Sequence, residues 1–285
     1  MSRIAYVNGA YRPHRAASVH IEDRGYQFGD GVYEVWAVFG GRLADAEGHF
    51  VRLARSLEEL KIVAPMSRAA LTVVLYELLR RNRVRDGLLY LQVTRGVARR
   101  DHAFPTPDTA PSLVITTRAS DPAGTQARAA QGISVITLPE NRWGRCDIKS
   151  VNLLPNVLAK QIAKDVGSGE AWFVDSEGLV TEGASSNAWI VDRDGVLRTR
   201  PTTSNILRGV TRSTLMQVIA AHGIKVEEDA FTPAEAKAAR EAFITGAGAL
   251  VMPVVAIDGQ PIGNGHPGPV AEALRVAYIL AVSAK

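Results

Sequence analysis

Short extended segments joined by tight turns recur along the second half of the chain. Residues 171–181 hold two such segments around Gly178, and residues 188–199 hold two more around Gly195. Turns this short connect antiparallel strands. Helical patterns such as 211–222 appear singly and do not alternate regularly with the strands. The sequence therefore predicts an α+β fold and not an alternating parallel sheet.

The length of the chain suggests two domains. A chain of 285 residues with 46% apolar residues is long enough for two ordinary cores without disulfides. A stretch of small and turn-forming residues at 119–125 is the best candidate for a linker. We therefore expect an N-terminal domain at 1–118, a linker at 119–125 and a C-terminal domain at 126–285.

Charge and composition exclude several classes of partner. The chain carries 33 Lys and Arg against 29 Asp and Glu, without the aromatic interleaving of a nucleic-acid surface. The longest nearly apolar run, 247–257, is too short to cross a bilayer, and the first residues lack a secretory signal. The single cysteine, Cys146, suits a reducing compartment. We expect a cytoplasmic protein with no nucleic-acid or membrane partner, whose positive charge attracts an anionic cofactor or substrate.

The familiar catalytic motifs are missing. The sequence has no phosphate-binding P-loop, no dinucleotide-binding glycine motif and no nucleophile elbow. Its six histidines show no metal-ligand spacing, so we expect no metal site. Nucleotide kinases, dinucleotide oxidoreductases, serine hydrolases and zinc enzymes are all disfavoured.

One lysine stands in an unusual place. Lys149 lies among mostly apolar residues, where an extended segment meets a helix that we expect to begin near Asn152. An amine that is partly shielded from water can act as a nucleophile or a base. The alternative is a structural lysine whose ammonium group reaches water. Position alone does not decide between them.

Three features of the second half could complete a site around this lysine. Glu182 follows a strand and opens a run of small residues, 182–187. Residues 205–212 open a helix, whose N–H groups and the Thr211 hydroxyl form a seat for an anion. The turn at 245–248 is also made of small residues. An acidic turn or a helix cap explains each feature alone, but a lysine, an acid and a phosphate seat together are what a pyridoxal-phosphate site requires.

Seven segments of the chain resemble, in the same order, the D-amino-acid transaminases among the fold-type IV pyridoxal-phosphate enzymes. The segments are 22–35, 49–53, 91–96, 100–102, 145–150, 152–161 and 181–187. The resemblance covers essentially the whole chain. It implies bound pyridoxal 5'-phosphate (PLP), a small N-terminal α/β domain and a larger C-terminal pseudo-barrel domain that carries the PLP lysine.

The resemblance also implies roles for individual residues. Lys149 would be the Schiff-base lysine and proton shuttle, Glu182 would pair with the pyridinium nitrogen, and Arg52 would bind the phosphate. The other residues that it places around the cofactor are Ser185, Ser186, Leu207, Gly209, Val210, Thr211, Gly246 and Ala247. Two positions depart from the family pattern, since Ala184 and Ala247 stand where serine and threonine are common. Each loses at most one neutral hydrogen bond, worth about 1 kcal/mol.

Substrate recognition depends on fewer residues. By resemblance, Tyr33, Arg100 and His102 hold the substrate α-carboxylate, and the last two reach across a dimer interface, so a homodimer is implied. A guanidinium with neutral donors suits a carboxylate. The alternative is that Arg100 and His102 lie in a solvated loop and have no role in binding.

The expected function is a transaminase that moves the amino group of a D-amino acid, such as D-alanine, to a 2-oxo acid, such as 2-oxoglutarate, by a ping-pong mechanism. The alternatives are a branched-chain L-amino-acid transaminase and an (R)-amine transaminase. An aminodeoxychorismate lyase is a less favoured alternative. A relative that only binds the cofactor is disfavoured by the presence of Lys149, Glu182 and Arg52.

Overall fold

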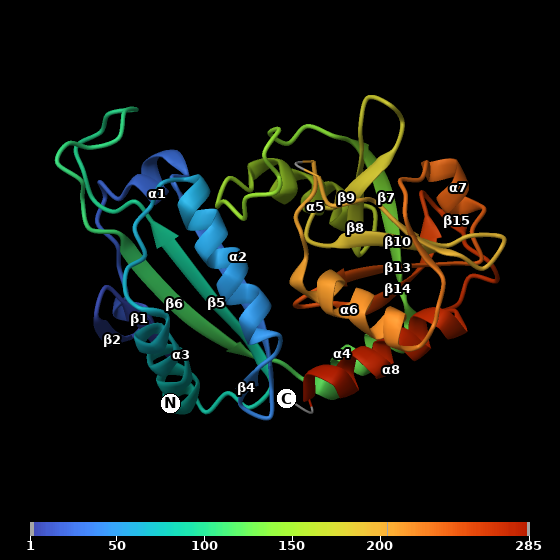
Figure 1. The fold of residues 1–285 in the computed structure, drawn as a ribbon, viewed down its shortest axis with the longest axis horizontal. Helices are drawn as coiled ribbons and strands as arrows, with labels where there is room; N and C mark the ends of the chain where they lie inside the picture. The colour runs from blue at the N-terminus through green and yellow to red at the C-terminus, as the bar shows by residue number, and fades with distance from the viewer. Residues whose placement is uncertain (1–2, 204, 284–285) are drawn as a thin grey trace. The chain divides into compact units, whose positions relative to one another are not determined.

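The computed structural model describes residues 3–203 and 205–283. The chain forms two compact units (Figure 1). The first unit holds the described residues up to Asp121 together with Ile148–Asn152, and the second unit holds Pro122–Asp147 and the described residues from Leu153 onward.

The first unit is built on an antiparallel sheet, which has six strands in its described part, in the order β2-β1-β6-β5-β3-β4. The strands are β1 (Ile4–Val7), β2 (Ala10–Pro13), β3 (Gly31–Phe39), β4 (Arg42–Leu43), β5 (Gly87–Thr94) and β6 (Ser112–Ala119). The helices are the 3-10 turn η1 (His14–Ala16), α1 (Arg24–Phe28), α2 (Ala46–Glu59) and α3 (Arg68–Asn82). Burial alternates along β5, as expected for a sheet with one covered face. Apolar residues of α2 and α3 complete one core with the inner face of the sheet.

The segment Ile148–Asn152 pairs with the start of β3. The backbone N–H of Tyr33 donates to the Lys149 carbonyl at 2.9 Å, and Val32 and Ser150 form an isolated bridge. Ile148 is buried in the core of the first unit. The sequence-based expectation put Lys149 with the C-terminal domain, but these contacts group it with the first unit. The reason is that β3 offers free backbone groups at its first residues, which the passing segment satisfies.

The second unit is built on a mixed sheet of nine strands in its described part, in the order β12-β11-β10-β13-β14-β7-β8-β9, with β15 beside β14. The β7–β8, β7–β14 and β11–β12 pairs are parallel and the others are antiparallel. The strands are β7 (Ile133–Pro139), β8 (Glu170–Val174), β9 (Val180–Gly183), β10 (Asn187–Val191), β11 (Leu197–Thr199), β12 (Val226–Glu228), β13 (Glu241–Gly246), β14 (Leu250–Ile257) and β15 (Gln260–Pro261). The β8–β9 and β10–β11 hairpins confirm the prediction from the turn-forming residues.

Helices cover the second sheet. They are α4 (Pro122–Gln131), α5 (Leu154–Asp165), α6 (Val210–Ala221), α7 (Pro233–Lys237) and α8 (Pro269–Ser283). Helix α5 packs on β7 and β8, whereas α6 and α8 pack on each other and on β13 and β14. Helix α4 begins at Pro122, inside the segment expected as a linker, because proline suits a first helical turn and Ala129 is buried in the core of this unit. Within the described residues, no helix has the length and apolarity needed to cross a membrane.

Candidate active site

Lys149 and Tyr33 lie together in the first unit. The Lys149 Nζ is 4.1 Å from the centroid of the Tyr33 ring, and the lysine side chain is half-buried. The Lys149 backbone N–H donates to the Ser56 hydroxyl at 3.3 Å, which ties the segment to α2. The lysine therefore has a fixed backbone, a shielded amine and an aromatic neighbour.

A buried ion cluster stands on the core-facing side of β3. Glu34 accepts hydrogen bonds from Arg52 Nε at 2.7 Å and Nη2 at 2.8 Å, and lies 2.7 Å from His49 Nδ1. Burial alone would raise the pKa of Glu34, but Arg52 and His49 lower it to about 2. Burial lowers the pKa of His49, against the opposing effect of Glu34. The cluster thus keeps Glu34 ionised and holds the Arg52 guanidinium in one orientation.

Sequence reasoning named Arg52 but missed Glu34 and His49. Both stand in segments that carried the family resemblance, 22–35 and 49–53. The available signal was a glutamate at an inward-facing strand position between Val32 and Trp36, where an unpaired charge is costly.

Arg100 and His102 lie on the exposed segment between β5 and β6. The Arg100 guanidinium is 4.8 Å from the Phe28 ring centroid, and the His102 ring is 5.4 Å from it. The Arg24 side chain donates to the His102 carbonyl at 3.3 Å, which anchors the segment to α1. Tyr33 contacts Lys149 and Tyr90 instead. Arg100 and His102 thus lie together beside Phe28, and Tyr33 packs against Lys149 and Tyr90.

Glu182 is a buried acid of the second unit. Its carboxylate accepts hydrogen bonds from Arg142 Nη1 at 2.5 Å, from Asn187 Nδ2 at 3.0 Å and from the Leu207 backbone N–H at 3.1 and 3.2 Å. The Leu207 backbone is thereby held beside the carboxylate. Arg142 was not among the expected site residues.

The start of α6 meets the 185–187 turn. Gly209 is the N-cap of α6 and packs so closely on Asn187 that a Cβ there would overlap the amide oxygen. A Cβ on Gly246 would lie 3.1 Å from the Ser185 carbonyl oxygen. No side chain caps α6 within the part of the chain that the structure describes. The first-turn N–H groups, at Val210 and the buried Thr211, therefore have no side-chain cap.

The Ser185 and Ser186 hydroxyls have a partner of their own. Both donate to Glu170 Oε2, at 2.6 and 3.1 Å, and the Lys160 ammonium lies 3.3 Å from the other oxygen of Glu170. Glu170 is almost wholly buried. It orders the turn through the two hydroxyls and was missed from the sequence, because its partners are 15 and 16 residues away.

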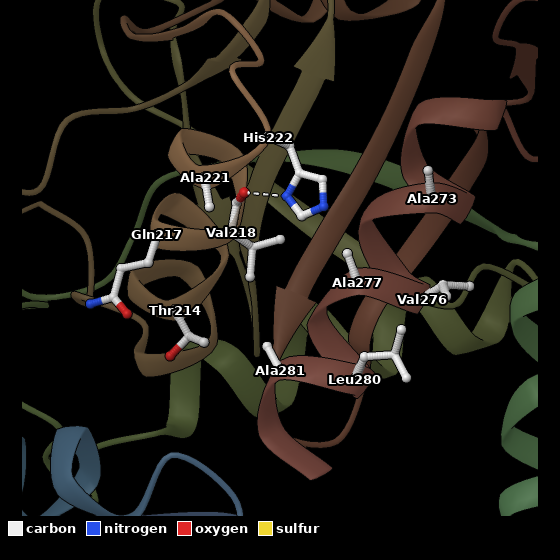
Figure 2. Close-up of a pocket in the computed structure, with 10 residues that line it drawn as sticks. All are labelled: Thr214, Gln217, Val218, Ala221, His222, Ala273, Val276, Ala277, Leu280 and Ala281. Carbon is white, nitrogen blue, oxygen red and sulfur yellow. Dashed lines mark hydrogen bonds between the residues drawn. The ribbon is translucent and has the colours of Figure 1, made fainter. Parts of the chain in front are cut away.

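A groove of about 690 Å³ opens between α6 and α8 (Figure 2). Its lining is mostly apolar, with Val218 on α6 and Val276 and Leu280 on α8. The His222 ring is turned back to the Val218 carbonyl, at 2.8 Å. None of the residues expected at the cofactor lines this groove, and its chemistry does not suit a phosphate.

The chain matches known proteins over nearly its whole length. Residues 31–257 match the family model of class IV amino-transferases. The chain is 43% identical to the D-alanine aminotransferase of Bacillus licheniformis over 281 residues, which are 98% of each chain. It is 39% identical to the D-alanine aminotransferase of Staphylococcus haemolyticus over 274 residues, covering 96% of this chain and 95% of that one.

Solved structures confirm the expected fold. A branched-chain amino acid aminotransferase from T.th., solved with pyridoxamine 5'-phosphate, superposes with a TM-score of 0.90 at 27% identity, covering 100% of this chain and 95% of that one. The branched-chain enzyme of Escherichia coli, at 24% identity, shares the fold with a TM-score of 0.89 over 99% and 95% of the two chains. The chain belongs to the class IV aminotransferase family.

Proposed function

We propose that this protein is a PLP-dependent D-amino-acid transaminase, which moves the amino group of a D-amino acid such as D-alanine to a 2-oxo acid such as 2-oxoglutarate. The observation that carries the proposal is the match, over nearly the full length, to relatives named D-alanine aminotransferase at 38–43% identity. Lys149, Glu182 and Arg52 supply an amine, a carboxylate and a guanidinium in held positions, which is the donor set that the cofactor needs.

The second unit offers a place for the ring and the phosphate. Glu182 is buried and ionic, so it suits a protonated ring nitrogen, and Leu207 would pack on the ring. No side chain caps α6 in the described part of the chain, so its first N–H groups are available to phosphate oxygens. By the family resemblance, the phosphate contacts would be Gly209, Val210, Thr211, Gly246 and Ala247, with Arg52. Ser185 and Ser186 would line the site through their backbone, since their hydroxyls are bound to Glu170.

The residues of the chain would then move the protons. When bound, the cofactor supplies an electron sink for the carbanion at the substrate Cα. The Lys149 amine would accept the proton that leaves the substrate Cα and act as its shuttle. The ring of Tyr33 beside Nζ restricts the directions that the amine can take. The Tyr33 hydroxyl, with Arg100 and His102 reaching across the dimer interface, would hold the substrate carboxylate and so fix the hydrogen that faces Lys149.

We further propose a homodimer. One face of α5 exposes five large apolar side chains, a pattern typical of an interface. They are Leu154, Val157, Leu158, Ile162 and Val166, with exposures of 69%, 59%, 53%, 46% and 64%. Arg100 and His102 are themselves exposed, so they are accessible to a partner protomer. The lone cysteine, Cys146, cannot form an intramolecular disulfide, which favours a cytoplasmic enzyme.

A branched-chain L-amino-acid transaminase is the second candidate, because branched-chain enzymes superpose closely on this chain. Their identity to it, 24–27%, is well below that of the D-alanine aminotransferases.

A half-reaction separates the candidates. The cofactor-loaded protein is mixed with D-alanine, L-leucine or (R)-1-phenylethylamine, each without an acceptor, and the cofactor absorbance is followed. We expect a fast change with D-alanine alone, and none in the Lys149→Ala variant. A change with L-leucine or the amine alone would overturn the D-amino-acid assignment while leaving the transaminase chemistry intact. Full activity of Lys149→Ala would overturn that chemistry.

A further inference from the structure

Arg142 lies between two carboxylates. Its Nη2 is 2.6 Å from Glu140 Oε2, its Nε is 2.9 Å from Glu140 Oε1, and its Nη1 is 2.5 Å from Glu182 Oε1. The side chains of Arg142 and Glu182 are only 7% and 6% exposed, and that of Glu140 is 19% exposed. A single guanidinium thus bridges a partly exposed acid and a buried one.

The bridge is held from several sides. The Arg142 guanidinium lies 4.6 Å from the Phe173 ring centroid, and the Thr181 hydroxyl donates to Glu140 Oε2 at 2.8 Å. Asn187 donates to Oε2 of Glu182, and the Leu207 backbone N–H lies 3.1 and 3.2 Å from the two carboxylate oxygens. The three charged groups therefore have fixed separations, and removing one changes the electric field at the others without freeing them.

The cluster of two carboxylates and one guanidinium has a formal net charge of minus one. Burial would lower the pKa of Arg142, but the two acids raise it, and Arg142 lowers the pKa of Glu140 against burial. Arg142 and Glu140 therefore stay ionised near neutral pH. Among the described residues, the Cys146 thiol also faces the cluster, and burial raises its pKa to about 11, so it is neutral. Asp147, next to Cys146, is paired with Arg145.

We propose that Arg142 and Glu140 are positioning residues that set how strongly Glu182 stabilises a proton on the group that it faces. The positive charge of Arg142 reduces the negative electrostatic potential at Glu182. The negative charge of Glu140 partly cancels this effect of Arg142. The inference rests on the proposed function, in which Glu182 faces the ring nitrogen of PLP, and deepens it by naming two residues that control the nitrogen through Glu182.

Replacing the two residues should shift the pKa of the ring nitrogen in opposite directions. A nonspecific loss of structure would not produce opposite shifts. Glu140→Gln is nearly isosteric and removes the negative charge that partly neutralises Arg142. Arg142 then weakens the negative potential of Glu182 more strongly, so the ring nitrogen loses its proton at a lower pH. Arg142→Gln removes the positive charge, so the nitrogen keeps its proton to a higher pH. Arg142→Lys keeps the charge and should behave like the unchanged protein.

The experiment uses holoenzyme loaded with PLP that carries ¹⁵N in its ring. The ¹⁵N chemical shift of the ring nitrogen is followed against pH, over the range in which each protein stays folded, and the midpoints are compared. Glu77→Gln is the matched control, because Glu77 also lies between two arginines, Arg80 and Arg81, but on the exposed surface of α3. We expect the Glu140→Gln midpoint to fall by about one pH unit, a tenfold change in proton affinity.

Midpoints in the order Arg142→Gln, unchanged protein, Glu140→Gln, from high to low, support the proposal. Shifts of the same sign in both variants, or no shift in Glu140→Gln, overturn it. If Arg142→Gln does not fold, the test is the midpoint of Glu140→Gln compared with the midpoints of Arg142→Lys and Glu77→Gln. A lower midpoint in Glu140→Gln alone then supports the proposal. An unchanged protein that binds no PLP would instead overturn the proposed function, so the two failures are distinguishable.

Discussion

Glu34 holds the Arg52 guanidinium through two of its nitrogens, Nε at 2.7 Å and Nη2 at 2.8 Å. Glu34 is fully buried and the Arg52 side chain is 10% exposed, so water competes little for the pair. The contact joins β3 to the middle of α2, and His49 on the same helix supports it. A side chain proposed to bind phosphate is thus oriented by a residue that the ligand need not touch.

Replacing Glu34 should weaken cofactor binding. Glu34→Gln removes the charge that holds Arg52 and leaves a buried guanidinium without its counter-ion, which costs roughly 3–5 kcal/mol in comparable cases. We expect at least a tenfold rise in the PLP dissociation constant, measured by titrating the apoprotein and following the bound-cofactor absorbance. Glu47→Gln is the control, because Glu47 pairs with Arg68 on the surface, where ion pairs contribute little. Equal PLP affinity in the two variants would contradict the role of Glu34.

His49 should make stability depend on pH below neutrality. Its folded-state pKa is lowered, chiefly by burial, so the folded protein binds this proton less readily than the unfolded chain does. The corresponding stability is complete above the unfolded value of about 6.5 and declines as the pH falls below it. His49→Gln removes this dependence while keeping a donor for Glu34. The gap between the unfolding free energies of the two proteins, measured with urea, should narrow from about pH 7 to pH 5. If the difference in unfolding free energy instead grows as the pH falls, the pKa of His49 is not lowered by folding.

The hairpins and most helices could be predicted because their signals are local. A glycine between two apolar runs predicts the β8–β9 turn, and the apolar spacing of 211–222 predicts α6. The segment around Lys149 gave no such signal, because nothing in residues 148–152 tells which sheet edge they will satisfy. Its place with the first unit follows from the unpaired backbone at the start of β3.

The same limit applies to the site. Lys149, Glu182 and Arg52 could be named because their types and spacing follow a family pattern. Glu34, Glu170 and Arg142 could not, since a charged residue beside a strand is usually solvated and their contacts to Arg52, Ser185 and Glu182 span 18, 15 and 40 residues. These supporting residues appear only when the fold has brought the partners together.

The anion seat at α6 should not tolerate a side chain at its N-cap. Gly209→Ala would place a methyl group on the Asn187 amide oxygen, and Asn187 holds both Glu182 and the Leu207 carbonyl. We expect PLP binding to fall at least tenfold, since more than one supporting hydrogen bond is disturbed. Gly144→Ala is the control, because a Cβ at Gly144 meets nothing within 4 Å. Retained PLP affinity in Gly209→Ala would show that the α6 N-terminus does not receive the phosphate.

The apolar face of α5 should determine the oligomeric state. Leu158 is 53% exposed, and in a two-fold dimer a substitution there enters the interface twice. Burying one such side chain contributes about 1.5–3 kcal/mol, so Leu158→Glu should raise the dimer dissociation constant by well over tenfold. Sedimentation velocity at several protein concentrations measures this shift. Val73→Glu is the control, because Val73 is a 69% exposed valine on α3, outside the α5 face, and the variant should sediment like the unchanged protein. If Leu158→Glu remains fully dimeric at the dilutions where the unchanged protein is dimeric, the interface lies elsewhere, and the exposed segment with Arg100 becomes the next place to test.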